Sequence, residues 1–241
     1  MKLVKSIARA AVLGLLACSL GAAFAQEAAI RKNLAERLPS LSKIDEVSKT
    51  PMNGLYEIRV NESDIFYTDA EGNFLIQGSL IDTKAKRNLT EERVEKLSAI
   101  DFDALPLKDA FIQVRGNGKR KLAVFADPNC GYCKRFERDL QKVNDVTIHT
   151  FLLPILGADS TEKSKNIWCA KDKGQAWLDW MIRDQTPTKA SCDSAAMERN
   201  VAFSKKHKIT GTPTLFFADG SRVPGAIGLQ QIEKQLASAK P

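Results

Sequence analysis

The residues best suited to chemistry in this 241-residue chain are two cysteines separated by two positions, Cys130 and Cys133. They follow a short apolar run that predicts a strand, and they precede a segment in which apolar residues recur at helical spacing. A helix N-terminus carries unpaired N–H groups and a partial positive charge, which favour a thiolate. A second thiol one turn further on can attack the mixed disulfide that the first one forms. The pattern therefore predicts a redox-active dithiol at a strand-to-helix junction.

The spacing within this motif predicts a different role for each cysteine. Cys130 begins the helix next to Gly131 and Tyr132, so we expect it to be exposed and to act as the nucleophile. Cys133 lies on the apolar face of the helix, which predicts a shielded thiol that resolves the mixed disulfide. A structural disulfide and a metal site are the alternative interpretations. A metal site needs two further ligands, and the other cysteines and the histidines lack metal-ligand spacing, so we expect no metal and no cofactor.

The first 25 residues have the features of an export signal. A basic stretch precedes an apolar segment over residues 10–20, which is too short to span a bilayer. The small-x-small pattern Ala23-Phe24-Ala25 predicts cleavage after Ala25. A lipid anchor on Cys18 is the alternative, but the residues that follow Cys18 are apolar where a tether would be polar.

The charge of the chain excludes one class of partner. Removal of Lys2, Lys5 and Arg9 with the signal reduces the 36 basic residues to 33, against 29 acidic ones, so the net charge falls from +7 to about +4. This excess is small and scattered, which favours solubility and argues against nucleic-acid binding. About 216 residues remain, enough for one large domain or two small ones.

The cysteine count predicts one further disulfide. The chain has five cysteines, and four remain after removal of the signal. An even number in an exported protein indicates disulfides, with three possible connectivities. Cys130 and Cys133 form one natural pair, which leaves Cys169 and Cys192 for a structural disulfide. On the chain-entropy model, a bridge that closes this loop stabilises the fold by about 3 kcal/mol.

Residues 26–82 predict a small N-terminal domain rich in strands. A short helix is expected over 27–38. Apolar and polar residues alternate over 55–60, and the strands expected over 64–68 and 74–80 flank a segment rich in turn-forming residues. A piece of this size cannot bury much core alone. We expect it to pair with a second copy of itself.

Residues 83–109 predict a linker that contains a helix. Residues 83–90 are polar, and Thr90 can cap a helix over 91–100 whose first turn is acidic. This helix is mostly polar, which is typical of a spacer or hinge between domains.

Residues 110–241 predict a second domain of the α/β class. The order β-α-β, helices, β-β-α is typical of helices packed on a mixed sheet. We expect strands over 111–115, 121–126, 146–153, 214–218 and 221–227, and helices from the cysteine motif to about 143, within 160–206 and over 229–237.

The step from Thr212 to Pro213 is a second signal. A proline that follows Gly211-Thr212 and enters an apolar run can adopt a cis peptide bond in a tight turn. Alone, the pattern favours a simple strand start. Combined with a C-x-x-C unit about 80 residues earlier, it favours the cis turn.

Together these features resemble the thioredoxin superfamily and, within it, the DsbC and DsbG family of periplasmic thiol:disulfide interchange proteins. The resemblance covers nearly the whole mature chain. The Gly-Tyr dipeptide between the cysteines is similar to DsbC, since DsbG-like proteins usually carry Pro-Tyr and DsbA-like oxidases Pro-His. The residues that carry the resemblance are Phe74-Leu75-Ile76-Gln77-Gly78, the linker helix, Cys130-Gly131-Tyr132-Cys133, the later cysteine pair and Gly211-Thr212-Pro213.

The resemblance implies a thioredoxin-like C-terminal fold with a helical insertion, and a homodimer joined through the N-terminal domains. It implies that Thr212 and cis-Pro213 contact the substrate backbone beside Cys130, and that a DsbD-like membrane reductase keeps the cysteine pair reduced. The implied function is isomerisation or reduction of disulfides in misfolded exported proteins in the periplasm. Two other functions stay open: a DsbG-like reductase of sulfenylated cysteines, and a dimeric chaperone.

One departure from the superfamily pattern concerns a buried acid. Thioredoxin-like reductants keep such an acid six residues before the first cysteine, where this chain has Val124. Asp127 is nearer to the motif, but it lies in a turn with a proline, and we expect it to be exposed or to cap the helix. Without a buried base, deprotonation of Cys133 is less assisted, which fits a more oxidising couple.

Overall fold

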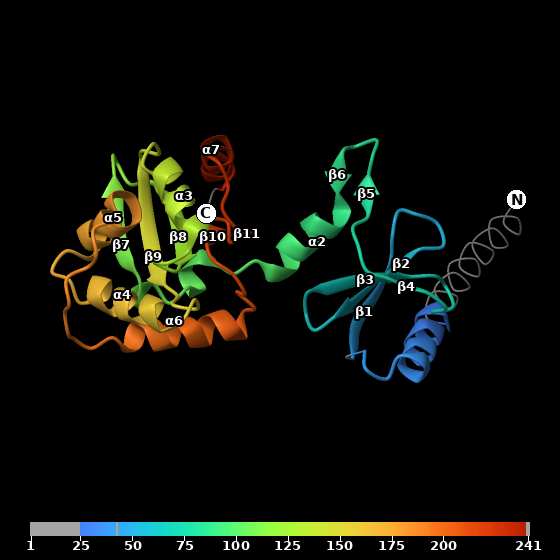
Figure 1. The fold of residues 1–241 in the computed structure, drawn as a ribbon. Coiled ribbons are helices and arrows are strands. Elements are labelled where there is room, and N and C mark those ends of the chain that lie inside the picture. The colour runs from blue at the N-terminus through green and yellow to red at the C-terminus, as the bar shows by residue number, and fades with distance from the viewer. Residues whose placement is uncertain (1–24, 42, 240–241) are drawn as a thin grey trace, which may run out of the picture. The chain divides into compact units, whose positions relative to one another are not determined.

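The computed structural model describes residues 25–41 and 43–239 (Figure 1). The expected export signal therefore lies outside the described residues, except for Ala25. The chain divides into two compact units, unit 1 (Met1–Leu97) and unit 2 (Ser98–Pro241). Among the described helices, none has both the length and the apolar character needed to cross a membrane.

Unit 1 contains a four-stranded antiparallel sheet in the order β1-β2-β3-β4. The predicted alternation in the second strand is confirmed, because Tyr56, Ile58 and Val60 are buried and the residues between them are partly exposed. Residues 25–37 are helical, in agreement with the predicted helix, and Ile30 and Leu34 pack into the same small core. The strands are β1 (Ile44–Lys49), β2 (Tyr56–Val60), β3 (Asp64–Thr68) and β4 (Leu75–Ile76).

Residues 83–90, the first part of the expected linker, include part of a short hairpin. Strand β5 (Ile81–Asp82) pairs with β6 (Arg87–Asn88) in a short hairpin, and the Asp82 carboxylate accepts a hydrogen bond from the N–H of Ala85 at 2.8 Å. The polar composition suggested a linker, but local hydrogen bonds of this kind order polar residues into a turn.

Helix α2 (Leu89–Ser98) follows the hairpin directly and begins two residues before its predicted start. None of its residues is buried, as its polar sequence predicts. Arg93 pairs with Glu57 at 2.9 Å and with Glu46 at 2.8 Å, so ion pairs attach this helix to the sheet of unit 1.

Unit 2 contains a five-stranded mixed sheet in the order β11-β10-β8-β9-β7 (Figure 1). The two central strands β8 and β9 run parallel, and the other pairs are antiparallel. The predicted mixed sheet is confirmed, although the last strand is shorter than expected. The strands are β7 (Phe111–Arg115), β8 (Arg120–Ala126), β9 (Val146–Leu152), β10 (Thr214–Phe217) and β11 (Arg222–Pro224).

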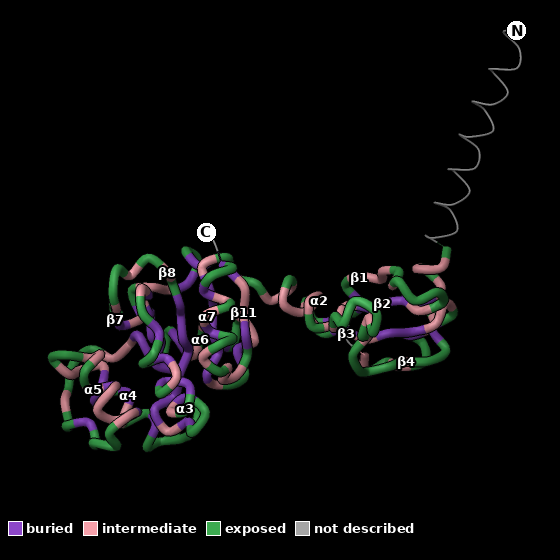
Figure 2. Tube along the Cα trace, turned by 90° about the horizontal axis from the view of Figure 1, so that it is seen from above, coloured by how far each residue is buried: buried purple, intermediate pink, exposed green. Residues whose placement is uncertain are grey.

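Apolar cores lie against both faces of this sheet, which is why β8 is buried continuously from Leu122 to Ala126 (Figure 2). Leu122 and Val124 join one cluster with side chains of α3, α5 and α7, while Phe125 joins a second cluster with Phe102 and Phe216. Helix α3 ends three residues before its predicted end. The helices are α3 (Gly131–Leu140), α4 (Ala158–Trp168), α5 (Lys173–Arg183), α6 (Ala195–Lys206) and α7 (Leu229–Ser238), and short 3-10 turns cover Phe102–Ala104 and Leu107–Asp109.

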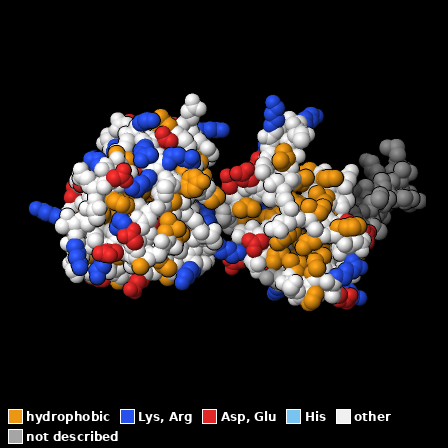
Figure 3. Space-filling model, in the orientation of Figure 1, with side chains coloured by type: hydrophobic (Ala, Val, Ile, Leu, Met, Phe, Trp, Pro, Cys, Tyr) orange, Lys and Arg blue, Asp and Glu red, His pale blue; other side chains and the backbone are white. Residues whose placement is uncertain are grey.

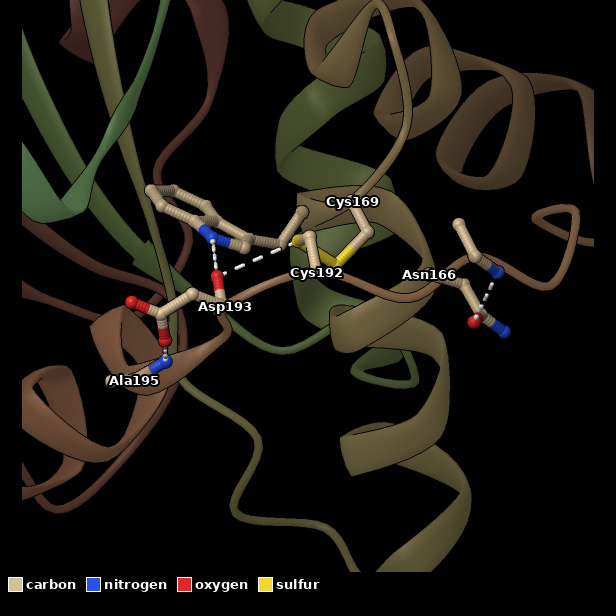
Figure 4. The surroundings of a disulfide bond; sticks show 7 residues. Asn166, Cys169, Cys192, Asp193 and Ala195 are labelled. Atoms are coloured by element: carbon tan, nitrogen blue, oxygen red, sulfur yellow. Dashed lines mark hydrogen bonds between the residues drawn. A yellow bond between two sulfur atoms is a disulfide. The ribbon is translucent and has the colours of Figure 1, made fainter.

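The helices inserted between β9 and β10 carry a disulfide between Cys169 and Cys192, the pairing predicted from the cysteine count (Figure 4). Hydrogen bonds flank it on both sides. The Trp168 indole N–H donates to the carbonyl of Asp193 at 3.0 Å, and the Asn166 side chain accepts from the N–H of Ala190 at 3.2 Å. The segment that carries Cys192 is thus fixed to α4 by the covalent bond and by these contacts.

Candidate redox-active site

The C-x-x-C motif lies where β8 leads into α3. Cys130 is the N-cap residue of α3, and its Sγ accepts a hydrogen bond from the N–H of Cys133 at 3.4 Å. The N–H of Cys130 donates to the carbonyl of Asp127 at 3.1 Å, which closes the turn that starts the helix. The first sulfur therefore lies at the positive end of the helix, as the sequence predicts, and both thiols are free.

The expected exposure of Cys130 was wrong. Its residue surface is only 7% exposed, and Cys133 is 2% exposed, as predicted. Gly131 and Tyr132 between them are exposed. The Cys130 side chain is turned inward, and the thiol donates a hydrogen bond to the carbonyl of Thr212 at 3.2 Å. This cover comes from a loop 82 positions further along the chain, which helical spacing alone could not reveal.

The peptide bond between Thr212 and Pro213 is cis, which confirms the expected turn. The loop is fixed by two hydrogen bonds: the Thr214 hydroxyl donates to the carbonyl of Gly211 at 2.8 Å, and the N–H of Gly225 donates to the carbonyl of Pro213 at 2.8 Å. The fold thus places Thr212 against Cys130 from the start of β10, the strand beside β8.

The surroundings of Cys130 favour its thiolate. The Cys133 thiol contributes most, by donating a hydrogen bond to the Cys130 sulfur, and the Thr212 hydroxyl and the N–H groups of Cys133 and Tyr132 add to it. Burial and the contact with the Thr212 carbonyl act in the opposite direction, because they favour the neutral thiol. The donors prevail and lower the pKa of Cys130 from 9.0 to about 5, so this cysteine is ionised at neutral pH.

Cys133 has the opposite character. Burial raises the pKa of its thiol well above the ordinary range, and the neighbouring Cys130 sulfur raises it further. Cys133 therefore stays protonated while Cys130 is ionised. One helical turn therefore holds a thiolate, Cys130, and a shielded thiol, Cys133, that donates a hydrogen bond to it.

Asp127 is fully buried, contrary to the expectation that it is exposed or caps the helix. Its carboxylate accepts hydrogen bonds from the N–H groups of Asn129, Ile155 and Leu156 at 2.7, 2.8 and 3.0 Å, and from the Ser160 hydroxyl at 2.7 Å. A buried carboxylate is retained when donors satisfy its oxygens. Three of these donors come from about 30 positions further along the chain, so no local pattern identified them.

A second buried acid, Glu137, was missed at the sequence level. It follows Cys133 by one helical turn and accepts hydrogen bonds from the Trp177 indole at 3.0 Å and the Gln141 amide at 2.7 Å, with Arg115 at 3.4 Å. Burial raises the pKa of its carboxyl group. A glutamate on the apolar face of α3 was the available signal. These contacts attach α3 to α5 and β7, while position 124 holds a valine that is buried.

Within the described part of the chain, no group of three or more His, Cys, Asp or Glu side chains is arranged to hold a metal ion.

Two family models match the chain. A thioredoxin-like domain covers residues 107–240, and the N-terminal domain of disulfide bond isomerase proteins covers residues 21–91. A "Probable thiol:disulfide interchange protein DsbC" from Bordetella parapertussis is 43% identical over 211 residues, which span 88% of this chain and 74% of that relative. The chain belongs to the DsbC family of thiol:disulfide interchange proteins.

Further DsbC relatives extend the comparison. The "Thiol:disulfide interchange protein DsbC" of Escherichia coli K12 is 30% identical over 218 residues, which span 88% of this chain and 87% of that relative. A crystal structure of a disulfide interchange protein from Neisseria gonorrhoeae matches with a TM-score of 0.54 and 37% identity, and covers 56% of this chain and 98% of that one. The predicted fold class and enzyme class are therefore confirmed: a thioredoxin-like domain follows a DsbC-type N-terminal domain in a thiol:disulfide oxidoreductase.

Proposed function

We propose that Cys130 is the nucleophile and Cys133 the resolving thiol of a disulfide isomerase. The observation that carries this assignment is the contrast between the two thiols, since one is ionised at neutral pH and the other stays protonated. The thiolate is the attacking form of cysteine, and a lowered pKa also makes it a good leaving group.

In the first step the Cys130 thiolate attacks one sulfur of a substrate disulfide. The substrate S–S bond breaks, a bond forms between Cys130 and the attacked sulfur, and the other substrate sulfur leaves as a thiolate. In isomerisation, a different substrate thiolate then attacks the mixed disulfide and releases Cys130 as a thiolate. The protein and the substrate keep their oxidation levels, and only the pairing of the substrate cysteines changes.

Resolution by Cys133 gives reduction instead. Cys133 gives up its proton, which a substrate thiolate takes, and attacks the Cys130 sulfur. The substrate leaves reduced by two electrons, and Cys130 and Cys133 are joined in a disulfide. Because burial raises the pKa of Cys133, this second attack is slow compared with displacement by an exposed substrate thiolate. The difference favours isomerisation over net reduction.

Thr212 and Pro213 are assigned to the substrate backbone. Thr212 contacts the Cys130 sulfur, while Gly211 is exposed beside it. An extended substrate segment in a mixed disulfide must pass next to this sulfur. The cis turn presents backbone groups there, and these can pair with the backbone of any substrate sequence.

A homodimer through unit 1 completes the proposal. Figure 3 shows hydrophobic side chains gathered over the strands of this unit. Phe74 and Ile76 are exposed, and Ile76 lies in β4, the last strand of the sheet order, which has one side unpaired within the sheet. Exposed apolar residues at a free sheet edge favour pairing with a second copy of the same edge.

The cellular setting follows from the same chemistry. The export signal would direct the protein to the periplasm and be cleaved after Ala25, and misfolded exported proteins with wrong disulfides are the substrates there. Isomerisation needs Cys130 and Cys133 reduced at rest, so we assign a DsbD-like membrane reductase as the electron donor. No nucleic acid takes part.

The deciding experiment is the reactivation of a test protein with scrambled disulfides by residues 26–241, reduced beforehand. We expect recovery that is lost in Cys130→Ser and largely kept in Cys133→Ser, since direct isomerisation uses only the first thiol. Full recovery with Cys130→Ser would refute the assignment of the nucleophile. Recovery that depends equally on both thiols would show that reduction followed by reoxidation predominates.

A further inference from the structure

We propose that Trp180 is a positioning residue that holds the turn before Cys130, and with it the first turn of α3, in the geometry that the thiolate requires. The inference rests on the proposed role of Cys130 as the nucleophile. It adds a half-buried residue of the inserted helix α5 to the groups that determine the reactivity of that cysteine. Trp180 acts through the backbone of the turn.

One peptide unit of this turn is held at both of its polar ends. The Trp180 indole N–H donates to the carbonyl of Pro128 at 2.6 Å, and the N–H of Asn129 donates to the Asp127 carboxylate at 2.7 Å. The carbonyl and the N–H of a trans peptide point in opposite directions. These two partners therefore fix the plane of the peptide that joins Pro128 to Asn129, immediately before Cys130.

The carbonyl of Pro128 needs a partner within the protein, because Pro128 is buried. Helix α5 supplies that partner from 52 positions further along the chain. A buried acceptor that loses its donor bears the full desolvation penalty. Without the indole N–H, the turn must therefore shift until the carbonyl finds another donor or meets water.

Two ammonium groups hold the Trp180 ring in place. The Nζ atom of Lys134 in α3 lies 4.0 Å from the ring centroid, and that of Lys163 in α4 lies 4.7 Å from it. Cations over an indole ring are attracted by its electrons. Lys134 also pairs with Asp184, which follows α5, and Lys163 pairs with Asp159 in α4. Two neighbouring helices thus fix the donor that α5 presents to the turn.

The turn determines where the Cys130 sulfur lies relative to its donors. The N–H of Cys130 donates to the carbonyl of Asp127 at 3.1 Å, and the sulfur accepts from the N–H of Cys133 at 3.4 Å. Hydrogen bonds weaken steeply as their geometry departs from the optimum. The N–H groups of Tyr132 and Cys133 therefore lower the pKa of Cys130 only while the turn keeps them directed at the sulfur.

The test compares Trp180→Phe, which keeps an aromatic ring and removes the N–H, with the matched control Trp168→Phe. The Trp168 indole is also half-buried and donates to a backbone carbonyl, that of Asp193, at 3.0 Å. A lysine ammonium, that of Lys173, lies 4.1 Å from its ring centroid. The reduced mature proteins are mixed with glutathione disulfide, and second-order rate constants are measured at pH values on both sides of the pKa of Cys130.

We expect the midpoint of the pH profile to rise by about one unit in Trp180→Phe, because weaker donors stabilise the thiolate less. The rate constant on the alkaline plateau, where Cys130 is fully ionised, should rise about threefold, since a more basic thiolate is a stronger nucleophile. Trp168→Phe should keep the wild-type profile. A general loosening of the fold would not combine a higher midpoint with a faster plateau.

A second variant carries benzothienylalanine at position 180. This residue keeps the shape of the two fused rings and lacks the N–H, so the packing around it is preserved. The same shift of the midpoint is expected, which separates the loss of the hydrogen bond from the loss of ring volume in Trp180→Phe.

A wild-type midpoint in both position-180 variants would overturn the inference, and so would an equal shift in Trp168→Phe. Cys130→Ser is measured in parallel and separates the two hypotheses. Reaction of Cys130→Ser with glutathione disulfide at the wild-type rate would refute the proposed nucleophile. Its inactivity, together with an unchanged midpoint in the position-180 variants, would refute only the positioning role of Trp180.

Discussion

The two units of the chain differ in how they bury apolar residues. Thirty hydrophobic residues are buried in the two clusters of unit 2, on both faces of its sheet, and a disulfide adds a covalent constraint. The core of unit 1 has six such residues among those described, and it leaves Phe74, Ile76 and Ile81 exposed. Unit 2 therefore buries a core large enough to be stable alone, while unit 1 leaves apolar side chains exposed to solvent.

The contrast indicates that unit 2 carries the cysteine chemistry and that unit 1 carries the self-association. Cys130, Cys133 and the cis-proline loop all belong to the unit with the larger core, where neighbours hold each group in place. A second copy of the chain would cover the surface that unit 1 leaves exposed. Substitutions in the two units should accordingly produce separable effects.

The largest expected effect is on the stability of unit 2. In Cys169→Ser/Cys192→Ser we expect a loss of about 3 kcal/mol in the free energy of unfolding, since the bridge no longer restricts the unfolded chain. All three tryptophans lie in unit 2, so tryptophan fluorescence during denaturation follows this unit alone. Ser191→Ala, beside the bridge, is the control and should leave the midpoint unchanged.

The disulfide is far from the motif in sequence, and none of the hydrogen bonds that hold Cys130 involves it. The reactivity of Cys130 in the folded double variant should therefore match the wild type. An unchanged unfolding midpoint would show that the large core alone sets the stability of unit 2 and that the bridge has no structural role.

The next effect concerns self-association through unit 1. In Phe74→Ser/Ile76→Ser we expect a dimer dissociation constant raised about tenfold or more, because two apolar side chains would no longer be buried between copies. Sedimentation over a range of concentrations measures it. The control Ile112→Ser/Val114→Ser removes similar apolar surface from unit 2 and should stay dimeric. A wild-type chain that is monomeric at micromolar concentration would contradict the assigned role of unit 1.

Sequence patterns predicted the positions of most strands and helices, but they did not predict which distant residues contact them. Alternation over Tyr56–Val60 and helical spacing after Cys133 predicted a strand and a helix, because one face of each packs on a core. Residues 83–90 were expected to begin a linker, and they include the turn and second strand of the β5–β6 hairpin. Its order comes from turn hydrogen bonds such as that of Asp82, and polar composition alone does not distinguish such a turn from a flexible segment.

The candidate redox-active site was also predicted only in part. Residue type and spacing identified the cysteine pair, the cis bond at Pro213 and the partner of Cys169. They did not reveal that Cys130 is covered by Thr212, or that Asp127 is buried by donors from the loop after β9. Both facts depend on which distant segments the sheet brings together, and that is a property of the tertiary fold.

The smallest expected effect is on the pKa of Cys130 in unit 2. It tests whether the neighbouring hydrogen-bond donors lower this pKa. The thiolate of Cys130 forms above a pH of about 5, because its pKa is lowered to that value. The pKa of an ordinary cysteine is 9.0. Because the folded pKa is lowered, ionisation stabilises the reduced folded protein. This contribution is fully present above pH 9.0 and is lost as the pH falls through about 5.

Cys133→Ala removes the strongest donor to the thiolate. Hydrogen bonds to charged groups contribute about 1.5–3 kcal/mol, and one pKa unit corresponds to about 1.4 kcal/mol, so the pKa of Cys130 should rise by about one unit or more. Thiolate absorbance at a series of pH values measures the midpoint. Cys133→Ser keeps a donor and should shift it less. Equal midpoints in the alanine variant and the wild type would assign the low pKa to the backbone N–H groups and Thr212 instead, so that the helix terminus and the cis-proline loop alone would activate Cys130.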